Sequence, residues 1–229
     1  MILYAIPTPL GTPPAQVLPP SVLSTVKSLG DFAVENAKSA RAFLGAVGMD
    51  RPLRDLNIST LDGDPHILLQ PLREGRSLGL LSEAGCPAIA DPGAALVEAA
   101  HREGFRVVPL VGPSSIILAL MASGLEGQRF AFCGYLPREG AERVRRIREL
   151  ELRSQKERET QIFIETPYRS DVLLGALLES CAARTRLCVA ADLTLPSETI
   201  QTRSIVDWRR ARPELGRRPA VFLLLADSG

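Results

Sequence analysis

The sequence has few of the residues on which many metal and catalytic sites depend. Only two histidines, His66 and His101, and four cysteines occur among its 229 residues. It contains no Cys-x-x-Cys pair, no His-Glu-x-x-His motif and no Cys/His cluster at zinc spacing. We therefore expect no metal site, no histidine-based catalytic triad and no disulfide framework.

Long apolar runs and an excess of one charge are also missing. The apolar run from Ala220 to Ala226 is far shorter than the ~18 residues that span a membrane. The run from Ile2 to Ile6 has no basic region before it, unlike a signal peptide. The 27 basic and 26 acidic residues give a net charge of +1, so no global field attracts nucleic acid. We expect a cytoplasmic protein without a membrane segment, in which any RNA contact comes from a local basic patch.

Short β-rich runs alternate with helical patterns along the chain, which predicts an α/β protein with largely parallel sheets. The character of the pattern changes near Val111, so we expect an N-terminal α/β domain over 1–111 and a C-terminal α/β domain over 112–229. Strands are predicted at 2–7, 31–35, 77–81, 106–111, 160–165, 187–191, 199–204 and 220–226. Helices are predicted at 22–29, 37–47, 65–72, 93–103, 115–122, 138–159 and 170–181.

Two loops follow predicted strands, where open α/β sheets form their ligand crevices. The loop Pro7-Thr8-Pro9-Leu10-Gly11 has prolines where a dinucleotide site needs glycines, which argues against NAD or FAD. It is equally typical of a proline-stiffened turn. The loop from Ser82 to Gly93 is rich in small residues and carries Glu83 and Asp91, as in a ligand-binding loop. The other interpretation is a structural connection in which Asp91 and Pro92 cap the next helix.

The two loops and four further stretches resemble the tetrapyrrole-methylase superfamily of S-adenosylmethionine-dependent methyltransferases. Within it, the chain resembles the bacterial small-subunit ribosomal RNA 2′-O-methyltransferases of the I type. The matching stretches occur in the family's order at 3–11, 81–93, 107–114, 130–137, 162–169 and 193–200. The resemblance implies a two-domain tetrapyrrole-methylase fold, in which each half is a mostly parallel or mixed sheet flanked by helices. It also implies a homodimer that binds S-adenosylmethionine in the cleft between its halves.

Carried over position by position, the resemblance predicts which residues contact the cofactor. They are Pro9, Ser82, Glu83, Ala84, Gly85, Ile89, Ala90, Ser114, Ser115, Tyr135, Glu165, Thr166, Pro167, Leu193 and Ala220. Backbone amides and small side chains in this set suit a ligand whose adenosine and amino-acid ends need hydrogen bonds and close approach.

The sequence departs from the ribosomal RNA enzymes where substrate is expected. Those enzymes have an acidic residue followed by Asp-Thr-Arg after their second strand. In this chain only the acidic residue is retained, as Glu35. Their Ser-Asp-Ala-Gly-Thr-Pro loop reads Ser82-Glu83-Ala84-Gly85-Cys86-Pro87, and the chain lacks their longer C-terminal extension. These departures predict a divergent, short subgroup with its own acceptor.

In-line transfer of the sulfonium methyl group requires mainly alignment and exclusion of water. Glu35 and Glu83 are the candidate catalytic bases for a hydroxyl acceptor, and Lys38 and Arg41 are candidates for holding an anionic substrate. The alternative is that all four are solvated surface charges or helix caps.

Two segments are rich in arginine. In 138–159, acidic residues alternate with the basic ones, as on a solvent-facing helix with ion pairs. In the second, Trp208, Arg209 and Arg210 precede three further arginines with few acidic neighbours, which suggests phosphate contacts and an indole available for stacking on a base.

The lead hypothesis is therefore an S-adenosylmethionine-dependent methyltransferase that methylates a ribose 2′-hydroxyl of ribosomal RNA. One alternative is methylation of a tetrapyrrole or another small molecule. The other is a non-catalytic protein that binds S-adenosylmethionine.

Overall fold

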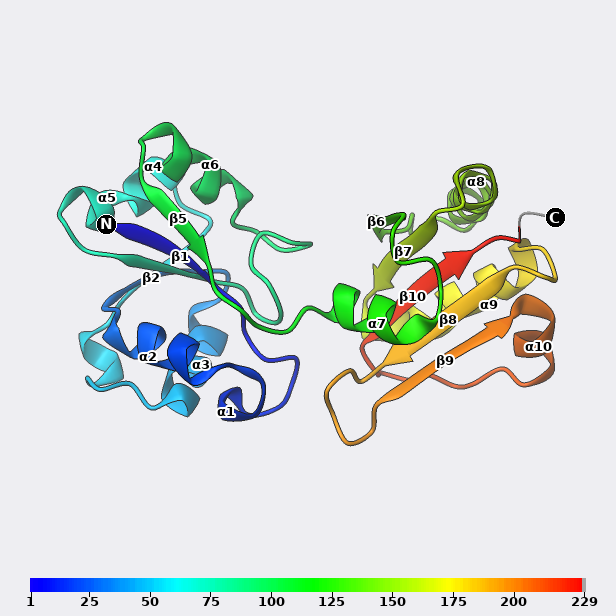
Figure 1. Ribbon diagram of the computed structural model, residues 1–229, viewed down its shortest axis with the longest axis horizontal. Helices are drawn as coiled ribbons and strands as arrows, with labels where there is room; N and C mark the ends of the chain where they lie inside the picture. The colour runs from blue at the N-terminus through cyan, green and yellow to red at the C-terminus, as the bar shows by residue number, and fades with distance from the viewer. Residues whose placement is uncertain (228–229) are drawn as a thin grey trace. The chain divides into compact units, whose positions relative to one another are not determined.

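The computed structural model describes residues 1–227 and consists of two compact units, Met1–Ser114 and Ser115–Gly229. The expected domain boundary at Val111 lies close to this division, and the last two residues of the expected C-terminal domain lie outside the described residues. Each unit is built on its own five-stranded sheet (Figure 1).

The N-terminal unit has a fully parallel sheet with the strand order β3-β2-β4-β1-β5. Its strands are β1 (Ile2–Ile6), β2 (Asp31–Val34), β3 (Asn57–Thr60), β4 (Leu78–Leu81) and β5 (Arg106–Pro109). Its helices are α1 (Pro14–Val17), α2 (Pro20–Ser28), α3 (Ala37–Val47), α4 (Pro65–Leu68), α5 (Gln70–Arg73) and α6 (Ala94–Arg102), with a 3-10 turn, η1 (Leu53–Asp55).

Both faces of this parallel sheet are covered, as burial of its strands requires. Phe32 and Val34 of β2 point to the core formed with α1, α2 and α3, whereas Ala33 between them points to a second core beneath α5 and α6. The helices on the two faces are visible in Figure 1. Because β2 contributes side chains to both cores, the sheet and the helices on its two faces pack together as one unit.

The C-terminal unit has a mixed sheet with the order β6-β7-β10-β8-β9. Its strands are β6 (Phe130–Tyr135), β7 (Thr160–Glu165), β8 (Arg186–Ala191), β9 (Thr199–Ser204) and β10 (Ala220–Leu225). Its helices are α7 (Ser115–Ser123), α8 (Gly140–Glu157), α9 (Ser170–Ser180) and α10 (Ile205–Arg210), with a 3-10 turn, η2 (Pro167–Arg169). Among the described strands only β6 and β7 pair in parallel, so this unit has the mixed sheet that the resemblance allowed rather than a largely parallel one.

Local sequence signals account for several helix ends. The Asn36 side chain accepts hydrogen bonds from the amides of Lys38 and Ser39 and so starts α3 directly after β2. The predicted helix over 65–72 is two short helices instead, because Pro71 has no amide hydrogen to continue the first one. None of the helices within residues 1–227 is long and apolar enough to cross a membrane.

Candidate functional site

The carboxyl ends of three neighbouring strands carry the predicted residues of the N-terminal unit. Pro7 follows β1, Glu35 follows β2 and Ser82 follows β4, and β4 lies between the other two strands. Because the strands are parallel, the loops that start with these residues all leave the sheet at the carboxyl ends of the strands. We call this end of the sheet in the N-terminal unit the N-terminal edge.

The two loops predicted from the sequence are hydrogen-bonded to each other at this edge. The Thr8 amide donates to the Gly85 carbonyl at 2.8 Å, and the Gly85 amide donates to the Thr8 carbonyl at 3.0 Å. The Thr8 hydroxyl also donates to the Ser82 carbonyl at 3.3 Å. Gly85 has φ +81°, a left-handed conformation that favours glycine. The structure therefore brings Pro9 and the segment 82–85 together.

Gly112, in the loop that follows β5, allows the chain to pass close to Pro7. A Cβ atom at this position would lie 2.4 Å from Pro7 Cβ and 3.0 Å from Leu18 Cδ2. Only a glycine fits there without displacing the proline, so Gly112 fixes the position of the first loop. Ser114 and Ser115 follow at the junction of the two units.

Three carboxylates gather at the N-terminal edge. Glu35 Oε2 accepts a hydrogen bond from the Glu83 amide at 3.0 Å, although the residues are far apart in the chain. Burial raises the pKa of Asp91, and the negative charges of Glu35 and Glu83 raise it further, while the Ser82 hydroxyl acts in the opposite direction. Both candidate bases therefore lie beside Asp91, which was predicted only as part of the loop.

Lys38 and Arg41 are exposed on the first turns of α3, immediately after Glu35. The Arg41 guanidinium donates to the Ala37 carbonyl of its own helix at 3.3 Å. The two cations thus lie near the start of the helix that follows Glu35, where a bound anion would also meet the helix N-terminus.

The end of the 82–93 loop has an unusual backbone. Ala88 and Ala90 have φ values of 66° and 64°, which non-glycine residues rarely adopt, and Ile89 between them is 50% exposed. Strained positions of this kind occur often in ligand-binding loops. Ile89 and Ala90, both predicted cofactor contacts, are therefore presented outward on a constrained turn.

The remaining predicted cofactor residues lie at one end of the C-terminal sheet, which we call the C-terminal edge. Glu165 of β7 pairs with Ala220 of β10, and Ala220 pairs with Ala191 of β8. Tyr135 of β6 pairs with Ile164 of β7. The residues after these positions, Thr166, Pro167 and Leu193, leave the sheet at the same end.

Buried ion pairs hold the loops of the C-terminal edge. The carboxylate of Glu165 is almost fully buried, is bound by the Arg169 guanidinium and accepts the Thr166 amide hydrogen at 2.7 Å. Burial raises the pKa of Asp192, but hydrogen bonds from Arg218 and Ser197 outweigh this effect and leave the pKa lower than usual. Sequence reasoning did not find these pairs, because no local pattern joins Asp192 to Arg218.

The Asp192–Thr194 turn contains a polar group suited to a ligand. Asp192 and Thr194 have φ values of 54° and 73°, and Leu193 between them is buried. The Thr194 hydroxyl is also buried and has no hydrogen-bond partner among the described residues. An unpartnered buried hydroxyl costs free energy unless a water or ligand binds it.

The stacking role expected for Trp208 is wrong. Trp208 is 2% exposed in the core of the C-terminal unit, and its Nε1 donates to the Leu187 carbonyl at 2.8 Å. Its neighbour Arg209 donates from Nε to the Leu178 carbonyl at 2.7 Å, and Arg210 lies 3.5 Å from Asp207. Trp208 and Arg209 therefore support the structure around α10, whereas Arg210 is exposed and its contact with RNA stays a prediction.

The arginines that follow also have partners within their own unit. Arg212 donates to the Asp171 carbonyl at 2.8 Å, Arg217 lies over the Tyr168 ring at 5.1 Å, and Arg218 binds Asp192. The charge-dense helix α8 has the ion pairs that its sequence predicts, including Arg146 with Glu149 at 3.2 Å.

The arrangement of the chain matches a class of proteins with solved structures. The methyltransferase CobJ aligns with 98% of this chain and 93% of its own, with a TM-score of 0.63 and 19% sequence identity. The chain therefore has the two-unit α/β fold of a methyltransferase, and the fold class predicted from the sequence is confirmed.

The chain belongs to the Tetrapyrrole (Corrin/Porphyrin) Methylases, whose family model matches residues 33–206. It is 32% identical over 193 residues to the ribosomal RNA small subunit methyltransferase I of Bacillus subtilis, a match that covers 84% of this chain and 64% of the relative. It is 33% identical over 200 residues to the protein of the same name from Vibrio cholerae, covering 87% and 67%. The chain thus spans about two thirds of the length of these relatives.

Proposed function

We propose that the chain is an S-adenosylmethionine-dependent methyltransferase whose acceptor is a ribose 2′-hydroxyl of small-subunit ribosomal RNA. This proposal rests on the two relatives described above, which are both named ribosomal RNA small subunit methyltransferase I. Each is about one third identical to this chain over more than four fifths of the chain's length. A homodimer and a cytoplasmic location remain predictions that accompany it.

Each edge by itself offers groups that suit a part of the proposed cofactor. Its sulfonium and amino groups are cationic, which suits the carboxylates of Glu35, Glu83 and Asp91 at the N-terminal edge. Its ribose and adenine need hydrogen-bonding groups, and the buried Thr194 hydroxyl beside Leu193 offers one. The residues proposed to hold it are Pro9, Ser82 to Gly85, Ile89, Ala90, Ser114, Ser115, Tyr135, Glu165 to Pro167, Leu193 and Ala220.

When bound, S-adenosylmethionine supplies a methyl group already activated for displacement. The protein then has to align the acceptor oxygen and, for a hydroxyl, remove its proton. We assign proton removal to Glu35, because the Glu83 amide fixes its Oε2. Lys38 and Arg41 on the following helix would hold the phosphates beside the reacting ribose.

The experiment that tests the acceptor uses methyl-labelled S-adenosylmethionine and an extract from cells lacking the protein. We expect label in the ribose of small-subunit ribosomal RNA after incubation with the purified chain. Label in a low-molecular-weight fraction would instead identify a tetrapyrrole or another small acceptor. Cofactor binding without any transfer would identify a non-catalytic protein, and either result contradicts the proposal.

The role of Glu35 is tested by Glu35→Gln, which keeps a hydrogen-bond acceptor for the Glu83 amide but removes the base. We expect kcat to fall by about 10²–10⁴ with little change in cofactor affinity. Glu98→Gln, an exposed carboxylate of α6, is the matched control for the change in charge. Full turnover in Glu35→Gln would exclude the base role, and the same measurement on Glu83→Gln would decide whether its neighbour replaces it.

A further inference from the structure

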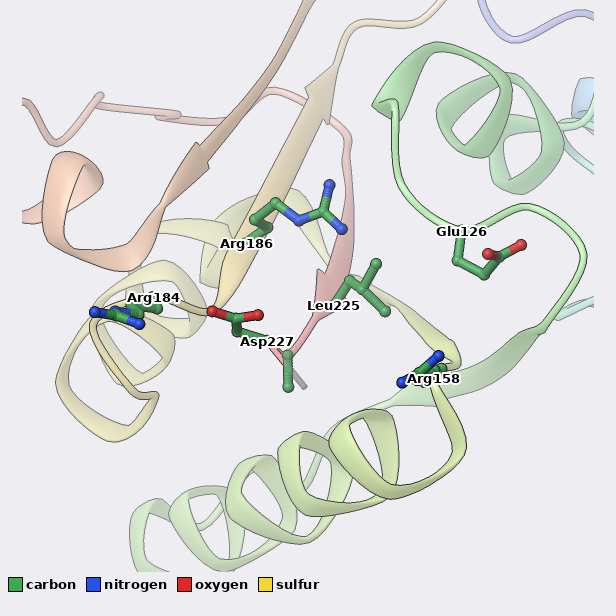
Figure 2. Close-up of a pocket in the computed structure, with 7 residues that line it drawn as sticks. Glu126, Arg158, Arg184, Arg186, Leu225 and Asp227 are labelled. Atoms are coloured by element: carbon green, nitrogen blue, oxygen red, sulfur yellow. The ribbon is translucent and has the colours of Figure 1, made fainter. Parts of the chain in front are cut away.

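A cavity opens at the end of the C-terminal sheet opposite to the C-terminal edge. It has a volume of about 540 Å³ and is lined by Glu126, Arg158, Arg184, Arg186, Leu225, Ala226 and Asp227. Figure 2 shows side chains from separate segments around it, namely the end of α8, the start of β8 and the end of β10. Arg158 is thereby brought onto one concave surface with Arg184 and Arg186, which lie far from it in the sequence.

The guanidinium groups of these three arginines are available for a ligand. Within residues 1–227, the side chains of Arg158, Arg184 and Arg186 make no hydrogen bond or ion pair, and all three residues are exposed. Arg209, Arg212 and Arg218 differ, since each donates to a carbonyl or a carboxylate of its own unit. The sequence favoured this second set for phosphate binding, but the first set has the free donors.

Arg186 also lines a second cavity of about 590 Å³, together with Thr202, Arg203, Ser204 and Asp207. The Arg203 guanidinium lies 5.0 Å from the centre of the Trp208 ring, which helps to position it. Arg203 pairs with Leu187, which belongs to the same core as Trp208, so it projects from the opposite face of the sheet to Arg186 and is separate from the first cavity. We call the surface of the first cavity the arginine groove and define it by Arg158, Arg184 and Arg186.

Two acidic residues, Glu126 and Asp227, line the groove beside its three arginines. Glu126 accepts the Gln128 amide hydrogen at 2.7 Å, which leaves its negative charge in place. Three guanidinium groups therefore face two carboxylates, and the residues that line the groove have a net charge of +1.

We propose that the arginine groove binds phosphate groups of the RNA substrate's backbone. Guanidinium groups bind phosphate oxygens through paired, charge-assisted hydrogen bonds, and unpaired arginines on a concave surface offer this geometry. This inference rests on the proposed function, because RNA supplies phosphates in the regular series that a groove of separated arginines can follow.

The groove contacts RNA away from the reaction. Strand β8 runs from Arg186 in the groove to Ala191, which pairs with Ala220 at the C-terminal edge. Five steps of ~3.3 Å place the groove about 17 Å along the strand from that edge. Phosphates bound there would orient the RNA without contacting the reacting ribose, so the groove should affect KM for RNA rather than kcat.

The test compares Arg184→Gln/Arg186→Gln with Arg145→Gln/Arg148→Gln, an equal loss of charge on the exposed surface of α8. The probe is a transcript of small-subunit ribosomal RNA, and its Kd is measured for the full chain at several salt concentrations. Loss of two phosphate contacts should reduce the slope of log K against log salt by about 1.4 and weaken binding about 25-fold at 0.1 M salt. In the methyl-transfer assay, KM for RNA should rise with kcat unchanged.

The outcomes separate this inference from the proposed function. If the unaltered chain binds the transcript but the groove variant behaves like the α8 control, the groove is not an RNA site, although the proposed function stands. If the unaltered chain neither binds nor methylates the transcript, both fail. If inorganic phosphate protects the groove from an arginine-modifying reagent but does not compete with RNA, free phosphate is the ligand and the RNA source is wrong. Thermal unfolding of both double variants confirms that each is folded.

Discussion

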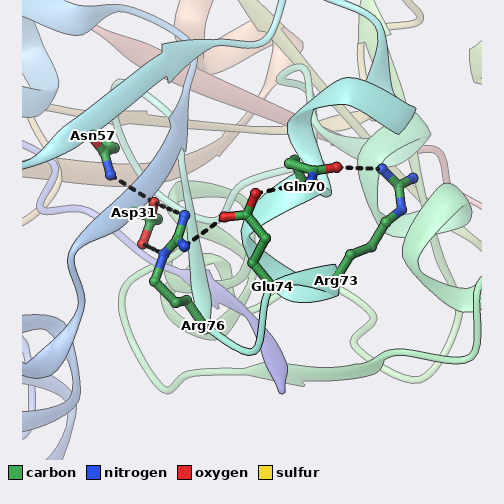
Figure 3. Close-up of polar contacts among 6 residues, drawn as sticks. All are labelled: Asp31, Asn57, Gln70, Arg73, Glu74 and Arg76. Atoms are coloured by element: carbon green, nitrogen blue, oxygen red, sulfur yellow. Dashed lines mark hydrogen bonds and ion pairs between the residues drawn. The ribbon is translucent and has the colours of Figure 1, made fainter.

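Arg76 donates two hydrogen bonds to the carboxylate of Asp31, from Nε to Oδ2 at 3.0 Å and from Nη2 to Oδ1 at 3.3 Å. The Asp31 side chain is only 6% exposed, and Asn57 of the neighbouring strand donates to the same carboxylate at 3.0 Å. Glu74 binds the other side of the Arg76 guanidinium at 2.6 Å (Figure 3). This network links β2, β3 and the turn before β4 at the end of the N-terminal sheet opposite to the N-terminal edge.

We expect Asp31→Ala to destabilise the protein because it removes a buried acceptor and leaves the Asn57 amide without its partner. Such losses cost about 1–3 kcal/mol each, or roughly 2–4 °C in Tm per kcal/mol for a chain of this size. The control is Asp55→Ala, which removes an exposed carboxylate that lies 3.7 Å from Arg54. This change should leave the stability of the protein nearly unaltered. Equal unfolding temperatures of the two variants would show that the network contributes no stability.

Gly112→Ala should move the loop that carries Pro9. The new methyl group would lie 2.4 Å from Pro7 Cβ, so the backbone must shift, at a cost of about 1–3 kcal/mol. S-adenosylmethionine affinity, measured by calorimetry, should fall together with Tm. Gly127→Ala is the control, because no atom lies within 4 Å of its Cβ position. An unchanged cofactor affinity in a destabilised Gly112→Ala protein would remove the first loop from the cofactor site.

Much of the fold follows from local sequence patterns, whereas pairing between distant segments does not. The strands Thr160–Glu165 and Thr199–Ser204 have the predicted bounds, because each apolar or alternating run ends at clear turn residues. The strand Asn57–Thr60 was missed, since it is a mostly exposed edge strand of polar residues. Nothing local indicates that β10 inserts between β7 and β8, and this insertion makes the second sheet mixed.

The candidate site was predictable only where a motif follows a strand. The 82–93 loop meets this condition, but the contact of Glu35 with the Glu83 amide depends on the order of β2 and β4 in the sheet. The arginines of the groove come from two separate segments, the end of α8 and the start of β8, so no run of basic residues marks it. For Trp208, the spacing from Ile205 was an available signal, because residues three apart share a helix face and both are buried.

Trp208→Phe should reduce stability without affecting RNA binding. The change removes the donor to the Leu187 carbonyl and part of a large buried side chain, which together cost about 1–3 kcal/mol. Tyr168→Phe, at an aromatic residue that is 74% exposed, should leave Tm unchanged. RNA affinity is measured well below the lower Tm. If Trp208→Phe had an unaltered Tm but a weaker affinity for RNA, Trp208 would stack on a base after all.

Asp91→Asn should stabilise the protein at neutral pH but much less in acid. Burial and the charges of Glu35 and Glu83 raise the pKa of Asp91 in the folded state above its ordinary value of 3.8. Between these two pKa values, the folded state binds more protons than the unfolded state, so the free energy of unfolding falls as pH rises through this window. The asparagine variant has no proton to lose and avoids this penalty.

Urea unfolding of both proteins from pH 3 to pH 8 measures the effect. The stability difference in favour of Asp91→Asn should be smallest below pH 3.8 and should grow until the pH passes the folded-state pKa of Asp91. Asp50→Asn, at an exposed position, controls for the change in net charge. A difference that is constant with pH would mean that the pKa of Asp91 is the same in the folded and unfolded states, and one that grows toward acid would mean that its charged form is stabilised. Either result would show that the three carboxylates do not share one electrostatic environment.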